Sequence, residues 1–281
     1  MSQLSSAAPP AGVVSLLRAA GCVFAEDEAR LLVAAARTEA DIARMVDQRT
    51  AGVPLEQVVG WAEFCGLRIA VDLGVFVPRR RTELLVRRAA ALAPAGAVVV
   101  DLCCGSGAVG TALGAAVDGV ELHALDIDPA AVRCARRNLL PAGGQVYEGD
   151  LYEPLPTALR GRVGVLVANA PYVPSASIEL MPAEARMHEP RVALDGGQDG
   201  LDVVRRVAAG SLEWLAPGGH LLVETSRRQA QETVEVLVRS GLAAQVTVDD
   251  ERNATVVSGS RAGYMAANSH QTGDATATFR S

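Results

Sequence analysis

The chain has 281 residues, of which 49% are hydrophobic but only 4% aromatic, and its formal net charge is −6. Alanine, valine and leucine carry the apolar content, which suits helices packed on a valine-rich sheet and argues against a β-sandwich. The negative net charge does not indicate the basic surface that binding long nucleic acid requires, so we expect no stable nucleic-acid binding.

The sequence carries no sign of a membrane or secretory protein. No apolar run reaches the length of a membrane helix, and the N-terminus lacks the basic start and apolar stretch of a signal peptide. The five cysteines are scattered and contain no Cys-x-x-Cys pair, so they form no disulfide framework. We therefore expect a cytoplasmic protein with free thiols and no membrane partner.

Residues 1–60 carry the apolar spacing of short helices. Thr38, followed three residues later by Asp41, is a candidate N-cap for the third helix. This segment predicts a small helical bundle, which is too short to be an enzyme by itself. Residues 61–82 differ, because their β-branched residues and glycines indicate a β-hairpin that connects the bundle to the next part.

From residue 83 to residue 264 short apolar runs alternate with helical segments. The runs AVVVD, ELHALD, QVYEGD, VGVLVAN and HLLVET each end at a polar residue or turn. Continuous apolar strands joined by helices predict an α/β domain whose parallel sheet is covered on both faces. Two further strands, joined by a turn near residues 250–253, complete this domain, and residues 265–281 read as a disordered tail.

A glycine loop, DLCCGSGAVG, follows the first strand of this domain. Gly105 and Gly107 permit positive φ and close approach of a ligand to the backbone, and the helix that follows offers free N–H groups. The segment GSGAVG also matches the Gly-x-Gly-x-x-Gly motif of dinucleotide-binding proteins, and Asp126 is placed where it could hold the ribose diol of such a cofactor. At this point a NAD-binding oxidoreductase remains open.

Three acids favour S-adenosylmethionine over a dinucleotide. Asp101 directly precedes the glycine loop, where an anion suits an ammonium and a sulfonium but not a pyrophosphate. Asp126 and Asp150 end the next two strands, and the ends of parallel strands share one edge of a sheet. Asp126 would hold the ribose, and Asp150 would reach the adenine amino group. The neighbouring Cys103 and Leu151, and Asn169 farther along the chain, are assigned to the same cofactor site.

The tetrapeptide Asn169-Ala170-Pro171-Tyr172 follows the fourth strand and looks like the Asn-Pro-Pro-Tyr signature of methyltransferases that act on planar nitrogens. Such a nitrogen is a poor nucleophile, because its lone pair is delocalised. Acceptors must hold its two N–H groups so that the lone pair meets the methyl carbon. The Asn169 side chain and the Ala170 carbonyl can supply them, and Tyr172 would lie against the flat acceptor group.

With these residues in view, the chain resembles the HemK/PrmC family of protein N5-glutamine methyltransferases, which modify the Gly-Gly-Gln loop of peptide chain release factors. The resemblance covers about residues 60 to 264 and includes FCGLRIAV, PRRRTELLV, DLCCGSGAVG, ALDIDPAAV, NAPYVP, HEPRVALDGGQDGLDVVRRV and VETSRRQ.

This resemblance implies a Rossmann-like class I methyltransferase fold with S-adenosylmethionine as cofactor. It also implies that the N-terminal bundle binds the substrate, a class I release factor. We further expect a monomer. Two departures indicate a divergent member. Ala170 replaces the first proline of the tetrapeptide, and Arg80 and Arg81 stand in PRRRTE where the family usually reads PRPETE.

An adenine N6-methyltransferase acting on nucleic acid uses the same tetrapeptide chemistry and is the main alternative, although the acidic total speaks against it. A NAD-binding oxidoreductase is the weaker alternative, because it has no use for the tetrapeptide. The four histidines show no metal-ligand spacing, so no metal site is expected. We assign His188 and Glu189 to surface or loop roles and Glu224 and Gln229 to the pocket wall. Residues 79–81 are assigned to a solvated face, the alternative being contact with an acidic or RNA-bearing partner.

Overall fold

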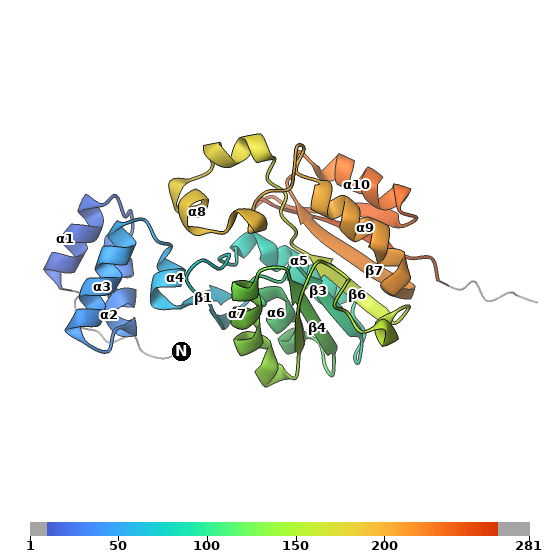
Figure 1. Cartoon of the computed structure of the whole chain (residues 1–281), viewed down its shortest axis with the longest axis horizontal. Helices are drawn as coiled ribbons and strands as arrows, with labels where there is room; N and C mark the ends of the chain where they lie inside the picture. The colour runs from blue at the N-terminus through green and yellow to red at the C-terminus, as the bar shows by residue number, and fades with distance from the viewer. Residues whose placement is uncertain (1–9, 264–281) are drawn as a thin grey trace, which may run out of the picture.

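The structure is a computed structural model that describes residues 10–263. Helices form its N-terminal part, a two-stranded hairpin follows, and a larger sheet carries helices on both faces (Figure 1). The helices are α1 Ala11–Ala19, α2 Ala25–Ala35, α3 Glu39–Thr50, α4 Leu55–Val59, α5 Glu83–Leu92, α6 Ala108–Ala116, α7 Pro129–Leu139, α8 Ala183–His188, α9 Asp202–Trp214 and α10 Ala230–Arg239. The strands are β1 Trp61–Phe64, β2 Leu67–Ala70, β3 Val98–Leu102, β4 Glu121–Asp126, β5 Gln145–Glu148, β6 Val163–Ala168, β7 Leu215–Thr225, β8 Ala243–Asp249 and β9 Ala254–Ser260.

Helices α1–α4 form the predicted N-terminal helical stretch. They pack around an apolar core of their own, to which Leu17 and Leu32 contribute fully buried side chains. Helix α3 begins as predicted, because the Thr38 Oγ1 accepts a hydrogen bond of 3.1 Å from the Asp41 N–H. Helix α4 ends at Gly60, whose φ of +83° lets the chain turn into the hairpin.

The predicted hairpin is confirmed for β1 and β2, which pair antiparallel. Cys65 and Gly66 connect them with φ of +50° and +73°, as a type I′ turn requires at both central positions. The Asn138 side chain of α7 then bonds to the Ala70 backbone twice, donating to its carbonyl and accepting from its N–H at 2.9 Å each. These two bonds attach the hairpin to the larger sheet's helices.

The larger sheet has the strand order β5-β4-β3-β6-β7-β9-β8. Strands β3 to β7 are parallel to one another, as predicted from their apolar runs. The predicted final pair forms an antiparallel hairpin in which β9 also pairs antiparallel with β7, leaving β8 at the edge. The chain runs from β3 to β4 on one side and returns to β6 on the other. Ligands of such sheets bind at this topological switch point.

Helices cover both faces of the sheet. Because side chains alternate along a strand, Val99 packs in the cluster that includes α5, α6 and α7. Its neighbours Val98 and Val100 pack in the opposite cluster, with residues of α9 and α10. All five residues of β3 are buried, which agrees with the prediction of a sheet covered on both faces.

Other predictions concern the boundaries between the domains. The division at residues 60 and 82 into bundle, connector and catalytic domain stays a prediction. The predicted tail, residues 265–281, lies outside the described residues. Between residues 10 and 263, none of the helices combines the length and the apolar character that crossing a bilayer requires.

Gly107 shows why the glycine loop needs glycine. It is the N-cap of α6 with φ +76°, and a Cβ there would lie 2.9 Å from the Leu139 Cδ1 and 3.1 Å from the Ala135 Cβ, both on α7. Cβ atoms do not approach carbon atoms this closely without displacing them. Gly107 therefore allows α6 to start against α7.

Gly107→Ala is expected to lower the free energy of unfolding by about 1–3 kcal/mol, because the substitution adds backbone strain and a steric clash. Urea denaturation measures the loss. Gly60→Ala is the matched control, since Gly60 also has positive φ but its Cβ would meet nothing within 4 Å. It should lose only the conformational part, about 1 kcal/mol. Equal losses in the two variants would mean that contact with α7 is not the cause.

Candidate active site

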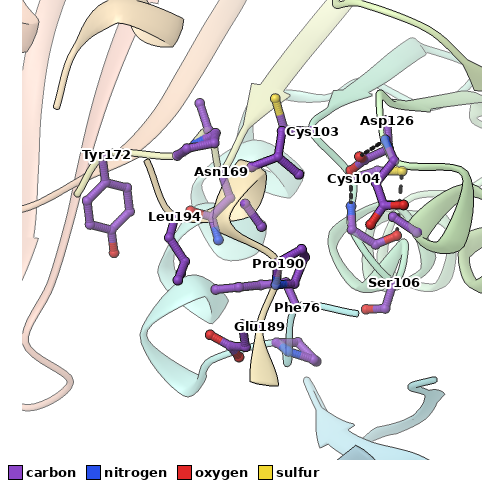
Figure 2. A pocket seen from close by; sticks show the side chains of 18 of the residues that line it. Phe76, Cys103, Cys104, Ser106, Asp126, Asn169, Tyr172, Glu189, Pro190 and Leu194 are labelled. Carbon is purple, nitrogen blue, oxygen red and sulfur yellow. Dashed lines mark hydrogen bonds between the residues drawn. The ribbon is translucent and has the colours of Figure 1, made fainter. Parts of the chain in front are cut away.

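A cavity of about 540 Å³ opens at the carboxyl ends of the central strands (Figure 2). It is lined by ten of the residues that the sequence assigned to the site: Asp101, Cys103, Gly105, Asp126, Asp150, Leu151, Asn169, Ala170, Pro171 and Tyr172. Gly107 does not line it and instead packs against α7. The cavity also reaches Glu56 of α4 and Glu184 of α8, so it extends between the N-terminal helices and α8.

Asp101 lies in β3 and is 1% exposed. Its Oδ2 accepts a hydrogen bond of 2.9 Å from the Gly110 N–H, whereas its Oδ1 bonds to none of the described residues. Burial raises the pKa of Asp101 to about 7. No cation of the described chain pairs with it. A buried carboxylate in this state suits a cationic ligand, which would stabilise its ionised form.

Asp126 ends β4 and shapes the loops around it. Its Oδ2 accepts a hydrogen bond of 2.8 Å from the Gly105 N–H, and its Oδ1 accepts one of 2.9 Å from the Asp128 N–H (Figure 2). Burial raises the pKa of Asp126 above its usual range. The carboxylate therefore fixes the glycine loop while it lines the cavity, and each oxygen keeps a lone pair for a hydroxyl donor.

Asp150 follows β5 by two residues and lines the same cavity. Its Oδ2 lies 2.6 Å from the Arg206 Nη2 of α9, so the ligand-free site already pairs this acid with a cation. Cys103 and Leu151 have φ of +56° and +47°, which is uncommon outside glycine and concentrates at functional sites. Burial raises the pKa of the Cys103 thiol well above its usual range, so this side chain is an apolar wall rather than a nucleophile.

The tetrapeptide leaves two acceptors without a partner. The Asn169 Nδ2 donates to the Thr82 Oγ1 at 3.4 Å, while the Asn169 Oδ1 bonds to none of the described residues. The Ala170 carbonyl likewise receives no hydrogen bond from a described backbone N–H, and the Ala170 N–H donates to none. A proline here would thus lose no hydrogen bond, and Pro171 already restricts the backbone of Ala170. The replacement of proline by Ala170 preserves the carbonyl.

Tyr172 does not stand free in the cavity. Its hydroxyl donates to the Glu224 Oε1 at 3.3 Å, and the guanidinium of Arg81 lies 5.8 Å from its ring centroid. The Arg81 Nε also donates to the Glu224 Oε1, at 3.2 Å. Figure 2 shows the Tyr172 ring beyond Leu194, farther from the cofactor end than Asn169. Tyr172 therefore forms an outer wall of the acceptor end.

A glycine-rich loop, residues 196–200, supports the tetrapeptide from behind. A Cβ on Gly196 would lie 2.7 Å from the Pro171 carbonyl oxygen, and one on Gly200 would lie 2.3 Å from the Tyr172 oxygen. The Gln229 Nε2 donates to the Tyr172 carbonyl at 3.0 Å and to the Asp199 carbonyl at 2.9 Å. The loop thus needs glycine because backbone packs on backbone, and Gln229 shapes the pocket wall.

The structure corrects two sequence assignments in part. Glu189 lies in a loop, as one of the two predicted roles has it, but not at the surface, since it is 5% exposed and lines the cavity. It accepts a hydrogen bond from the Val77 N–H and forms an ion pair with Arg79. Residues 79–81 are not simply a solvated face, because Arg79 and Arg81 both pair with buried carboxylates. Isolated charges in a sequence give no signal of such long-range pairing, so only the tertiary structure reveals it.

Thr82 and Phe76 also line the cavity, and the sequence did not single them out. Both lie in the segment that leads from the hairpin to α5, which also carries Arg79 and Arg81. In the part of the chain that the structure describes, no group of three or more ligating side chains is placed to hold a metal ion.

Comparison with known proteins agrees with this geometry. Residues 67–197 match the family model of the methyltransferase small domain. A release factor glutamine methyltransferase from Geobacter sulfurreducens is 37% identical over 221 residues, which cover 78% of this chain and 77% of that protein. A 4-amino-L-phenylalanine/4-methylamino-L-phenylalanine methyltransferase from Streptomyces pristinaespiralis is 36% identical over 186 residues, 64% of this chain and 63% of that protein.

A solved structure shares the fold. The crystal structure of a methyltransferase from Pyrococcus furiosus matches with a TM-score of 0.53 over 70% of this chain and 90% of that chain, at 14% identity. The cavity at the switch point and the sequence identity to the Geobacter protein lead to the same conclusion. The chain is an S-adenosylmethionine-dependent methyltransferase and belongs to the release factor glutamine methyltransferase family.

Proposed function

We propose that the enzyme transfers a methyl group to the side-chain amide nitrogen of a glutamine in another protein, namely the glutamine of the Gly-Gly-Gln motif of a class I peptide chain release factor. One observation carries this proposal. The Asn169 Oδ1 and the Ala170 carbonyl are consecutive acceptors without partners among the described residues, and both residues line the cavity that holds the buried acids.

These two oxygens match the needs of a planar amide. An amide –NH₂ has two donors in one plane, so two adjacent acceptors fix its orientation and expose its lone-pair face. The nitrogen must leave conjugation to attack, and a preorganised acceptor stabilises the positive charge that then develops on its N–H groups. The proton leaves after transfer, so no strong base is needed beforehand.

The opposite end of the cavity fits S-adenosylmethionine. When bound, this cofactor supplies the electrophilic methyl group of its sulfonium. We propose that Asp101 holds its ammonium, that Asp126 accepts from its ribose hydroxyls, and that Asp150 meets its adenine amino group. Cys103 and Leu151 would form apolar walls of this site. Two observations support the role of Asp101: its pKa is raised, and no cation of the described residues pairs with it. A cationic ligand would stabilise the ionised form of such a buried carboxylate.

The outer end of the cavity suits a protein loop. It is lined by Pro54 and Glu56 from the N-terminal helical part and by Glu184 and Ala185 of α8 (Figure 1). A loop that enters between these elements would be held on both sides, so we assign substrate binding to the helical part, residues 1–60. We further propose that the enzyme is a cytoplasmic monomer and forms no stable complex with nucleic acid.

Other acceptors are tested in the same assay. Adenine in nucleic acid has the same kind of planar nitrogen, but the net charge of −6 does not favour a polyanion. The Streptomyces relative is named for an aromatic amine of a free amino acid, which the same clamp could hold. A NAD-dependent reaction would leave the two acceptors at residues 169 and 170 without a role.

The decisive assay is intact-mass analysis of a class I release factor after incubation with the enzyme and labelled S-adenosylmethionine. We expect one added methyl group, located on the glutamine of Gly-Gly-Gln by peptide mapping, and none on a variant in which that glutamine is asparagine. Parallel reactions contain 4-amino-L-phenylalanine or adenine-bearing DNA. Methylation of one of these alone would overturn the proposed substrate.

Asn169→Ala is expected to reduce single-turnover methyl transfer by about 10²–10³, because a preorganised contact to the transition state is lost. Cofactor affinity, measured separately by calorimetry, should remain nearly unchanged. Asn169→Asp is the matched comparison and should be less damaging, since a carboxylate still accepts a hydrogen bond. Transfer at the wild-type rate by the alanine variant would show that this amide does not hold the acceptor nitrogen.

Cofactor affinity is expected to depend on pH through Asp101. A cation binds the ionised carboxylate, and the pKa of about 7 leaves much of this group protonated in mild acid. The dissociation constant should therefore fall roughly tenfold from about pH 5.5 to about pH 7. Calorimetry with S-adenosylhomocysteine, which keeps the ammonium, tests the effect.

The Asp101→Asn variant gives the control for this pH dependence. This variant should bind S-adenosylhomocysteine weakly, and its affinity should not increase with pH as that of the wild type does. The ligand-free wild type should also lose stability relative to the variant as pH rises from about 4 to about 7, because the folded-state pKa of Asp101 is raised. If the variant keeps the wild-type dependence of affinity on pH, a group other than Asp101 is responsible for that dependence.

A further inference from the structure

Thr82 occupies an unusual position for a threonine. It ends the 3-10 turn Arg80–Thr82, precedes α5 as its N-cap, and is 2% exposed. A threonine at an N-cap ordinarily uses its hydroxyl to accept a hydrogen bond from the first turn of its own helix. Here the side chain makes no such capping bond. The Thr82 hydroxyl is therefore committed elsewhere.

Its partner is the tetrapeptide. The Thr82 Oγ1 lies 3.4 Å from the Asn169 Nδ2 and accepts its N–H, and both residues line the cavity. This distance is at the long end for a hydrogen bond, and contacts of catalytic groups commonly tighten when the substrate binds. An asparagine side chain can rotate about its χ angles, so a hydrogen bond at its Nδ2 restrains where its Oδ1 lies.

The position of Thr82 is itself held on both sides. Arg79 pairs with Glu189, and the Arg81 Nε lies 3.2 Å from the Glu224 Oε1. These glutamates are 5% and 1% exposed, and removing the partner of a buried charge is strongly unfavourable. The Thr82 N–H also donates to the Arg79 carbonyl at 2.9 Å. Two ion pairs thus anchor the turn whose last residue meets Asn169.

We propose that Thr82 is a positioning residue for methyl transfer. In this role it acts through Asn169 rather than through the reacting atoms. Through its bond to the Asn169 Nδ2, it restrains the rotation of the Asn169 side chain and so holds the Asn169 Oδ1 in place for the acceptor nitrogen. This inference rests on the proposed role of Asn169 in the transfer.

Thr82→Val tests the proposal, because valine keeps the shape of threonine and removes only the hydroxyl. We expect kcat for release factor methylation to fall about tenfold, while the affinity for S-adenosylmethionine and the melting temperature stay close to the wild-type values. Thr82→Ser restores the hydroxyl and should recover most of the rate. Thr255→Val is the matched control, since Thr255 of β9 is also buried, at 3% exposure, but does not line the cavity.

A double variant separates positioning from general damage. If Thr82 acts only through Asn169, then adding Thr82→Val to Asn169→Ala should cost no further rate, because residues that act as a unit are not additive. A wild-type rate in Thr82→Val would overturn the proposal. So would a tenfold loss that persists in the Asn169→Ala background, since that loss would arise elsewhere.

A spectroscopic measurement decides the contact independently of the substrate. The side-chain amide resonances of Asn169 can be assigned in the labelled protein by their loss in Asn169→Ala. We expect Thr82→Val, but not Thr255→Val, to shift them in the enzyme bound to S-adenosylhomocysteine. Unchanged resonances would overturn the role of Thr82, whereas absence of methyl transfer by the wild type would overturn the proposed function and leave this result standing.

Discussion

Asp101, Glu189 and Glu224 are buried carboxylates, and the free-energy cost of burying a charge explains much of how the cavity is built. Asp101 and Glu189 line the cavity, whereas Glu224 bonds to two lining residues, Tyr172 and Arg81. The charges of Glu189 and Glu224 are compensated by ion pairs with Arg79 and Arg81, respectively. These two ion pairs hold the turn before α5 at both sides of the acceptor end. Asp101 has no such cation. This difference is why we propose Asp101 as the partner of the cofactor's ammonium.

The same constraint accounts for the departure from the usual family sequence at Arg81. Its guanidinium shares the Glu224 Oε1 with the Tyr172 hydroxyl, so the side chain belongs to the wall of the acceptor end rather than to the solvated surface. The departure at Ala170 is smaller in effect. Its carbonyl remains available, and Pro171 still restricts the turn. Neither change disturbs the two acceptors on which the proposed chemistry depends.

Much of the architecture follows from the sequence because local patterns specify local structure. The buried apolar run of β3 predicted a strand covered on both faces, and the Cys65-Gly66 pair lies at the tight turn of a hairpin that was predicted from its glycines and β-branched residues. The carboxyl ends of parallel strands must share an edge, so Asp101, Asp126 and Asn169 could be expected near one another before any coordinates.

What the sequence by itself determined is thus the element order, the cofactor edge and the tetrapeptide, all of which depend on short spacings and on a general rule of sheet topology. The tertiary structure alone decided the pairing of Arg79 with Glu189 and of Arg81 with Glu224, the contact of Thr82 with Asn169, and the insertion of β9 beside β7. Each of these joins segments far apart in the chain. Such contacts carry no local periodicity, because a charge or hydroxyl looks the same in sequence whether its partner is water or a residue more than a hundred positions away.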